Sequence, residues 1–188
     1  MSDMFNVQEP LDVQDLSDVK EEKNLTPVTK NLKVRVAKAG LMSNENKEQN
    51  KVANIKSLKL ELRIVDGIAT VDTESGETIM KYVNKPLFTG LMDVIVWADL
   101  TVPHAKGGTR ADQDWWKKKQ HLVGLSQFCK ALELPLTGLK ITDEFFAELI
   151  GKELLIDIQH EKETVLDSEG KRVATGTFKE KIRNFKKA

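Results

Sequence analysis

Residues 55–65, Ile-Lys-Ser-Leu-Lys-Leu-Glu-Leu-Arg-Ile-Val, are the stretch that decides the fold. Every second position from 58 to 64 is leucine or isoleucine, and the positions between them hold Lys59, Glu61 and Arg63. Successive side chains of a strand point to opposite faces of a sheet. The pattern therefore predicts a strand with one apolar face in the core and one charged face toward solvent.

The same alternation continues on both sides of this stretch. In Leu32-Lys-Val-Arg-Val-Ala-Lys38, which we expect to end at Gly40, Lys33 and Arg35 share the charged face. Asp66-Gly67 is a strong hairpin-turn signal after the deciding strand. Further strands are predicted at residues 68–73, at 87–97 with a bend at Gly90, and at 153–161 and 172–185, which a turn at 167–171 joins into a hairpin. Consecutive strands are thus expected to pair antiparallel.

Two helices are predicted between these strands. Asp112 is suited to cap a long helix that continues to Leu132 and ends before Pro135. Thr142 is suited to cap a short helix over 143–150. The element order predicts a mostly β (α+β) fold, an antiparallel five-stranded barrel like the oligonucleotide-binding fold, with the long helix between the third and fourth core strands.

Charge divides the chain into an acidic head and a basic-ended body. Residues 1–30 hold seven acidic residues against three lysines, a balance of −4, whereas residues 171–188 hold seven bases and one acid, a balance of +6. We therefore expect a binding domain over 31–188, preceded by an acidic arm. Apolar residues punctuate that arm at Phe5, Val7, Leu11, Val13, Leu16 and Val19. The arm is either a solvated, mostly disordered tail or a segment that contacts a partner or the protein's own basic surface.

Several functional classes find no support in the residues. Cys129 is the single cysteine, so neither an internal disulfide nor a CxxC motif is available. His104, His121 and His160 are widely spaced, and the chain contains no GxxxxGK[ST], HExxH or GxSxG motif. No apolar leader or membrane-spanning stretch occurs. We expect a cytoplasmic, non-enzymatic protein with no metal or other cofactor.

Four short stretches carry a resemblance to a known family. They are Leu32-Lys-Val34, Ala131-Leu-Glu-Leu-Pro135, the stretch from Leu149 to Ile158 and Lys181-Ile-Arg-Asn-Phe185. Over residues 31–187 the chain resembles small bacteriophage single-stranded DNA-binding proteins with an oligonucleotide-binding barrel. The resemblance implies coating of single-stranded DNA during replication or recombination in the host cytoplasm. Members of that family usually carry an acidic segment at the C-terminus, whereas this chain carries it at the N-terminus.

A single-strand binder needs cations that follow phosphates and exposed aromatic rings on which bases stack. Three predicted strands carry cations at alternate positions, so each set projects from one face. These candidate contacts are Lys33 and Arg35, Lys59 and Arg63, and Lys179, Lys181 and Arg183. Each set alone is also typical of a sheet face exposed to water, and only the three sets together favour a basic groove.

The segment 110–121 is the most specific local feature. Trp115 and Trp116 precede three consecutive lysines, and a Gly-Gly loop ending at Arg110 lies just upstream. The candidate contacts here are Arg110, Trp115, Trp116, Lys117, Lys118 and Lys119, to which Trp97 is added as a weaker stacking candidate. Adjacent helical residues lie about 100° apart, so at least one tryptophan of the pair is expected near the surface. Nucleic-acid contact and packing of the helix on the barrel stay open for this cluster.

Two other functional classes remain. A metal-dependent nuclease would use carboxylates such as Asp93, Asp99, Glu153 and Asp157, with Lys152 or Lys162 nearby. A protein-interaction adaptor would use the barrel and the acidic arm to bind replication, recombination or virion proteins. Single-stranded DNA is the partner that the cations and aromatics favour.

Overall fold

The computed structural model describes residues 25–43, 52–90, 92–169 and 171–188. The acidic arm predicted over 1–30 therefore lies outside the described residues except for 25–30. The strands are β1 Thr29–Ser43, β2 Ala53–Ile64, β3 Ile68–Val71, β4 Thr78–Lys81, β5 Pro86–Phe88, β6 Met92–Ala98, β7 Glu153–Leu166 and β8 Arg172–Lys187. The helical segments are η1 Arg110–Asp112, α2 Asp114–Lys117, η2 Gln120–Leu122, α3 Val123–Ala131 and α4 Asp143–Leu149.

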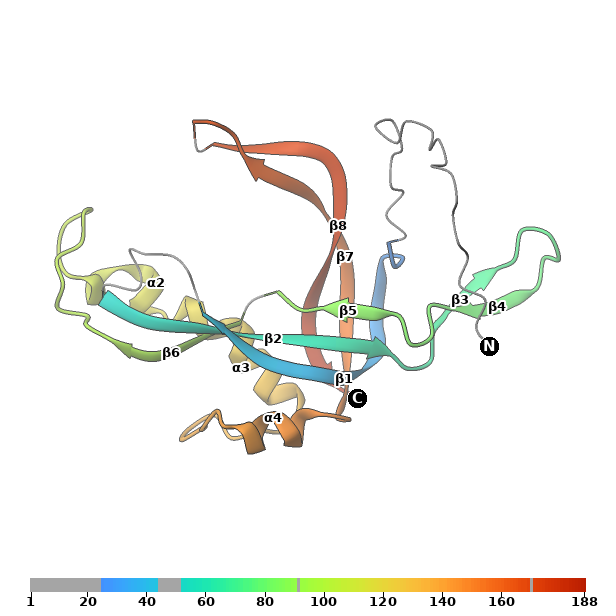
Figure 1. The fold of residues 1–188 in the computed structure, drawn as a ribbon, viewed down its shortest axis with the longest axis horizontal. Coiled ribbons are helices and arrows are strands. Elements are labelled where there is room, and N and C mark those ends of the chain that lie inside the picture. Colours follow the sequence, from blue (N-terminus) through green and yellow to red (C-terminus); the bar gives the residue numbers. More distant parts are fainter. Residues whose placement is uncertain (1–24, 44–51, 91, 170) are drawn as a thin grey trace, which may run out of the picture.

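The fold is mostly antiparallel β, as predicted. Its main sheet has the strand order β5-β2-β1-β7-β8 (Figure 1). β6 also pairs with β2, over residues 53–58, whereas β5 pairs with residues 61–63 of that strand. β3 and β4 form a separate hairpin. β5 and β8 end the path of this sheet, and no ladder joins these two strands among the described residues. Instead of the predicted closed set of five strands, the described residues form an open path of five strands, with β6 paired to β2 off that path, plus the small hairpin.

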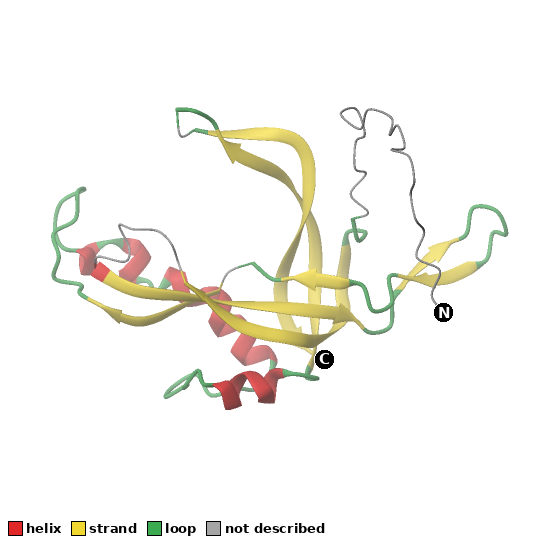
Figure 2. Ribbon diagram, in the orientation of Figure 1, coloured by secondary structure: helices red, strands yellow, loops and turns green. Residues whose placement is uncertain are grey.

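The core lies on the face that the alternation predicts. Leu58, Leu60, Leu62 and Ile64 of β2 are fully buried, and so are Val34 and Val36 of β1. Figure 2 shows the helices gathered on one side of the long strands. Phe128 of α3 and Phe145 and Leu149 of α4 complete this core. The charged alternate positions of β1 and β2 therefore face away from the helices.

The predicted long helix is wrong. Residues 110–131 form η1, α2, η2 and α3 in succession, and Lys119 adopts a left-handed conformation with φ of 51° between α2 and η2. This break folds the ring of His121 back against Trp115 and Trp116. The helical segments also follow the sixth strand rather than the third. The short helix is confirmed, since the Thr142 hydroxyl accepts a hydrogen bond from the Phe145 N–H.

Two strand boundaries also differ from the prediction. The strand predicted over 87–97 is split into β5 and β6, with Gly90 between them. β1 continues through Gly40 to Ser43 because residues 38–43 keep pairing with β2 beyond a bulge at Val36/Lys38. No helix of the described residues is long and apolar enough to cross a membrane.

Candidate nucleic-acid interface

The charged face of β1 and β2 carries the first two predicted sets of cations. Arg35 lies directly opposite Arg63 in the β1–β2 register. Lys33 forms a salt bridge with Glu153 at 2.7 Å, and Arg63 forms one with Glu61 at 2.5 Å. Arg35 forms no salt bridge with a described carboxylate and is exposed. The two strands do bring their cations together, with part of the charge neutralised.

Glu61 is buried although the alternation predicts it to face solvent. Lys38 reaches over it with a 3.0 Å salt bridge, and Arg63 pairs with its other oxygen. The hydrogen bond from Lys38 is the largest cause that lowers the pKa of the Glu61 carboxyl. Glu61 thus stays ionised and fixes two cations of this face in position.

Phe88 is the aromatic that the sequence analysis missed. It lies opposite Glu61 in the β2–β5 register, its side chain is 56% exposed, and the Lys59 ammonium lies 5.7 Å from the ring centroid. Its exposure follows from its place on β5, an edge strand. Pro86, two residues earlier on the same face, is the sequence signal for that edge, because proline in a sheet is confined to edge strands and bulges.

Phe88 borders two grooves on this side of the molecule. The first, here named the β8 groove, has a volume of about 600 Å³ and lies between the β5–β6 connection and β8. The second, the β1 groove, has a volume of about 310 Å³ and runs over β1 and β2 past Lys38, Lys59 and Glu61. The Phe88 ring belongs to both linings. It therefore connects the cations of β1 and β2 with those of β8.

The third predicted set, Lys179, Lys181 and Arg183, lines the β8 groove. Lys181 forms a 2.5 Å salt bridge with Glu161, and that hydrogen bond is the largest cause that lowers the pKa of the Glu161 carboxyl. Lys179 and Arg183 are exposed and form no salt bridge with a described carboxylate. Two cations of β8 are thus available to an anionic ligand.

The tryptophan pair lies at the other end of β2 and packs on it. Trp116 is buried, with 8% of its surface exposed, in a second apolar cluster with Ala53 and Ile55. The Trp115 and Trp116 rings are 4.9 Å apart in a T-shaped pair, and the His121 ring lies 4.7 and 4.8 Å from them. Trp116 therefore packs on the sheet, as one of the two alternatives for this cluster predicts, whereas Trp115 is half-buried.

The other candidates of this segment surround that cluster. Trp97 is 50% exposed and lies opposite Asn54 in the β2–β6 register, so it stands at the same end of β2. Lys117, Lys118 and Lys119 are all exposed, and Lys118 forms a salt bridge with Asp114 at 3.0 Å. Arg110 is half-buried at the start of η1, which precedes α2. This end is basic and separated from Phe88 by most of the length of β2.

Asp157, a carboxylate of the nuclease alternative, is held by structural partners. It is 6% exposed, and it accepts hydrogen bonds from the Asn184 amide at 2.8 Å and the Asn31 N–H at 2.9 Å. The Lys186 ammonium lies 3.1 Å away. These groups, with the Asn184 bond as the largest cause, lower the pKa of Asp157 to about 2. Asp157 ties β1, β7 and β8 together.

The other carboxylates of that alternative are not gathered around one point. Asp93 accepts a hydrogen bond from Ser57, Asp99 accepts one from Thr101, and Glu153 pairs with Lys33. No group of three described histidine, cysteine or acidic side chains is placed to hold a metal ion. Among the described residues, the geometry supplies a cationic and aromatic surface and no cluster of carboxylates.

Comparison with known proteins adds no assignment. No protein-family model matches the chain, and a search of curated proteins finds no significant match.

Proposed function

We propose that this protein binds single-stranded DNA across the outer face of β1, β2 and β5 and through the β8 groove. The exposed Phe88 ring at the junction of the two grooves is the observation that carries the proposal. A base stacked on an aromatic ring contributes about 1–3 kcal/mol and needs no particular sequence. Phe88 supplies one such platform at the centre of the cationic surface.

The cations around Phe88 suit a phosphate backbone. Arg35, Lys59, Lys179 and Arg183 form no salt bridge with described carboxylates, so a phosphate need not displace a carboxylate from them. Their charge raises affinity through release of counterions, a gain that falls as salt rises. The remaining cations, which are already paired, hold the shape of the grooves.

The strand order supports an oligonucleotide-binding barrel as the scaffold. Five long strands follow one another as β1, β2, β6, β7 and β8, and the helical segments come after the third of these. We infer that β3–β4 and β5 are additions to this barrel, and that the β8 groove marks its open seam. A partly open barrel of five strands is the usual form of this fold.

Polarisation of a labelled oligo-dT, titrated with the protein at two salt concentrations, tests the proposal. We expect binding that weakens with salt and persists in the presence of excess duplex DNA. A labelled strand that shortens when Mg²⁺ is added would instead indicate a nuclease. Absence of binding at low salt would overturn the proposal and leave the adaptor function.

The resemblance to bacteriophage single-strand binders extends the proposal to a biological role. The protein would coat and protect single-stranded DNA during replication or recombination, and the acidic arm would recruit proteins of those processes. Protection of an oligonucleotide from an added single-strand nuclease, in proportion to its occupancy, measures this role directly.

A further inference from the structure

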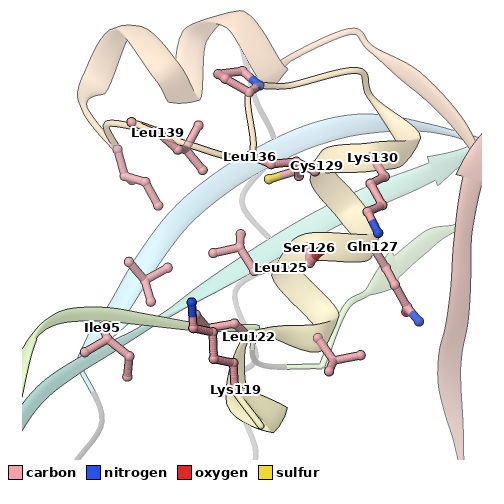
Figure 3. A pocket seen from close by; sticks show the side chains of 15 residues that line it. Ile95, Lys119, Leu122, Leu125, Ser126, Gln127, Cys129, Lys130, Leu136 and Leu139 are labelled. Atoms are coloured by element: carbon pink, nitrogen blue, oxygen red, sulfur yellow. The ribbon is translucent and has the colours of Figure 1, made fainter. Parts of the chain in front are cut away.

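A third groove adjoins the β8 groove on the α3 side, and Phe88 is not part of its lining. It has a volume of about 700 Å³ and runs between β6, α3 and the segment 135–141 (Figure 3). We name it the α3 groove. Its lining is mostly apolar, with Leu122 and Leu125 from the α3 region facing Leu136 and Leu139 across the opening. Its size is typical of pockets that accept several anchoring side chains.

The apolar surface of the α3 groove is open to solvent. Leu136 is 58% exposed and Val123 is 49% exposed. Such side chains are common singly, but here they line one concave surface together with the half-buried Leu122 and Leu139. Apolar side chains gathered in one concavity offer a surface against which another segment can pack.

The rim of the α3 groove is cationic. Lys119 and Lys130 lie near the two ends of α3 and belong to the lining. Neither lysine forms a salt bridge with a described carboxylate, and no described residue of the lining is acidic. The groove is therefore suited to a segment that combines apolar anchors with negative charge.

Residues 11–19 of this chain have that composition. The sequence is Leu-Asp-Val-Gln-Asp-Leu-Ser-Asp-Val, with apolar residues at Val13, Leu16 and Val19. An acidic residue directly precedes each of these three positions, and the segment contains no base. Each apolar side chain of the segment thus has a carboxylate next to it. This composition complements the α3 groove, which has an apolar floor and lysines at its rim.

The first described residues of the chain contact the β8 groove, which adjoins the α3 groove. The Thr26 N–H donates a hydrogen bond to the Glu180 carboxylate, and His160 Nε2 donates one to the Thr26 carbonyl at 2.8 Å. Glu180 lines the β8 groove, which shares Val123 and Gln127 with the α3 groove. Residues 20–25 add up to about 20 Å of extended chain from this anchor.

We propose that residues 11–19 dock into the α3 groove of their own chain, with Val13, Leu16 and Val19 on its apolar floor and the neighbouring carboxylates against Lys119 and Lys130. This contact uses neither Phe88 nor the β8 cations. The cross-linking test below is read without DNA, so either proposal can fail without the other.

Cross-linking within the full chain tests the docking. Val13→Cys and Leu136→Cys are combined in a Cys129→Ala background, so that only the two new thiols are present. Oxidation should join them within one chain at least about tenfold faster than it joins Val13→Cys to Thr73→Cys, an exposed turn position between β3 and β4. Equal rates for the two pairs, or products that are only dimers, would overturn the proposal.

The charges of the rim give a second arm to this experiment. Lys119→Glu with Lys130→Glu should lower the rate of the Val13–Leu136 cross-link several-fold, because the carboxylates of the segment then meet like charges. Lys81→Glu with Lys171→Glu, two exposed positions elsewhere, should leave the rate unchanged. Equal effects of the two double variants would remove the charge complementarity from the proposal and overturn it.

A measurement without cysteine variants keeps the proposal testable if those variants fold poorly. Leu16→Asp with Val19→Asp changes only the arm, in an otherwise unaltered chain. Displacement of the segment should expose the α3 groove and raise the fluorescence of an added apolar dye about twofold or more. Fluorescence identical to that of the unaltered protein would contradict docking.

Discussion

The two ends of β2 hold aromatic side chains in opposite situations. At the Ala53 end, Trp116 is buried against the strand and shares its environment with Trp115 and His121. At the other end, Phe88 is 56% exposed between two grooves lined by cations. Both sites combine aromatic rings with lysines, but the tryptophan pair packs on β2 whereas the Phe88 ring lies between two grooves lined by cations.

This difference shows what decides whether an aromatic ring stays accessible at the surface. The Trp115-Trp116-Lys-Lys-Lys run has the composition of a binding site, yet its rings complete a second apolar cluster over Ala53 and Ile55. Phe88 is isolated in the sequence but stands on an edge strand. Position in the sheet therefore outweighs local composition, and the variants below test that conclusion.

Trp116→Ala should have the largest effect, and on stability rather than on binding alone. Removing a buried tryptophan leaves a cavity, and we expect a loss of about 3–5 kcal/mol in the free energy of unfolding. Urea denaturation followed by circular dichroism measures it. Trp97→Ala, at the same end of β2 but half-exposed, should cost about 1 kcal/mol or less. Similar losses for the two variants would contradict the packing role of Trp116.

Asp157→Asn should destabilise the protein by about 2 kcal/mol, because it removes the charge opposite Lys186 and one acceptor of the Asn31 and Asn184 bonds. The pKa of Asp157 is lowered from 3.8 to about 2, so its contribution is complete above pH 4 and is lost as the pH falls toward 2. Urea midpoints measured between pH 5 and pH 2 should fall more steeply for the unaltered protein than for the variant. Parallel curves would exclude this account.

Phe88→Ala should weaken oligo-dT binding about tenfold and leave stability nearly unchanged, since the ring is exposed and one stacked base is lost. Phe178→Ala is the matched control, because Phe178 is 44% exposed but lines neither the β1 groove nor the β8 groove. Polarisation titrations compare the two. Equal losses of affinity would remove Phe88 from its proposed central role.

The smallest effect compares the cations of the two ends. Lys179→Ala with Arg183→Ala should reduce the slope of log affinity against log salt by about 1.4, since each phosphate contact to a single strand contributes about 0.7. Lys117→Ala with Lys118→Ala should change the slope less, because these lysines line neither of the two grooves beside Phe88. A larger change from the Lys117 pair would move the interface to the tryptophan end.

The sequence predicts well what depends on neighbouring residues. The alternation over 58–64 identifies the buried face of β2, and Thr142 caps α4. The hairpin of β7 and β8 is likewise local, because its strands are adjacent in the chain and pair across the predicted turn. The hairpin predicted at Asp66-Gly67 is wrong, because β3 pairs with β4 and has no ladder with β2 among the described residues.

Features that depend on distant residues were missed. The break at Lys119 follows from packing of the tryptophans on β2, about sixty residues earlier in the chain. Glu61 is buried because Lys38 of another strand reaches over it. Phe178 is 44% exposed because it pairs with Lys162, beyond the residues of β7 that pair with β1. Local pattern alone does not contain these contacts.

The hydrogen bonds of Asp157 have a consequence for folding during synthesis. Its partners Asn31 and Lys186 are separated by 155 positions. Both must be synthesised and clear of the ribosome before the contacts among Asn31, Asp157 and Lys186 can form. Until then, of the partners Asn31, Asn184 and Lys186, only the Asn31 N–H is available to Asp157, and the β1–β7 ladder lacks its link to β8. Such long sequence separation slows folding. Pulse-labelled nascent chains should therefore stay protease-sensitive until the last strand has emerged.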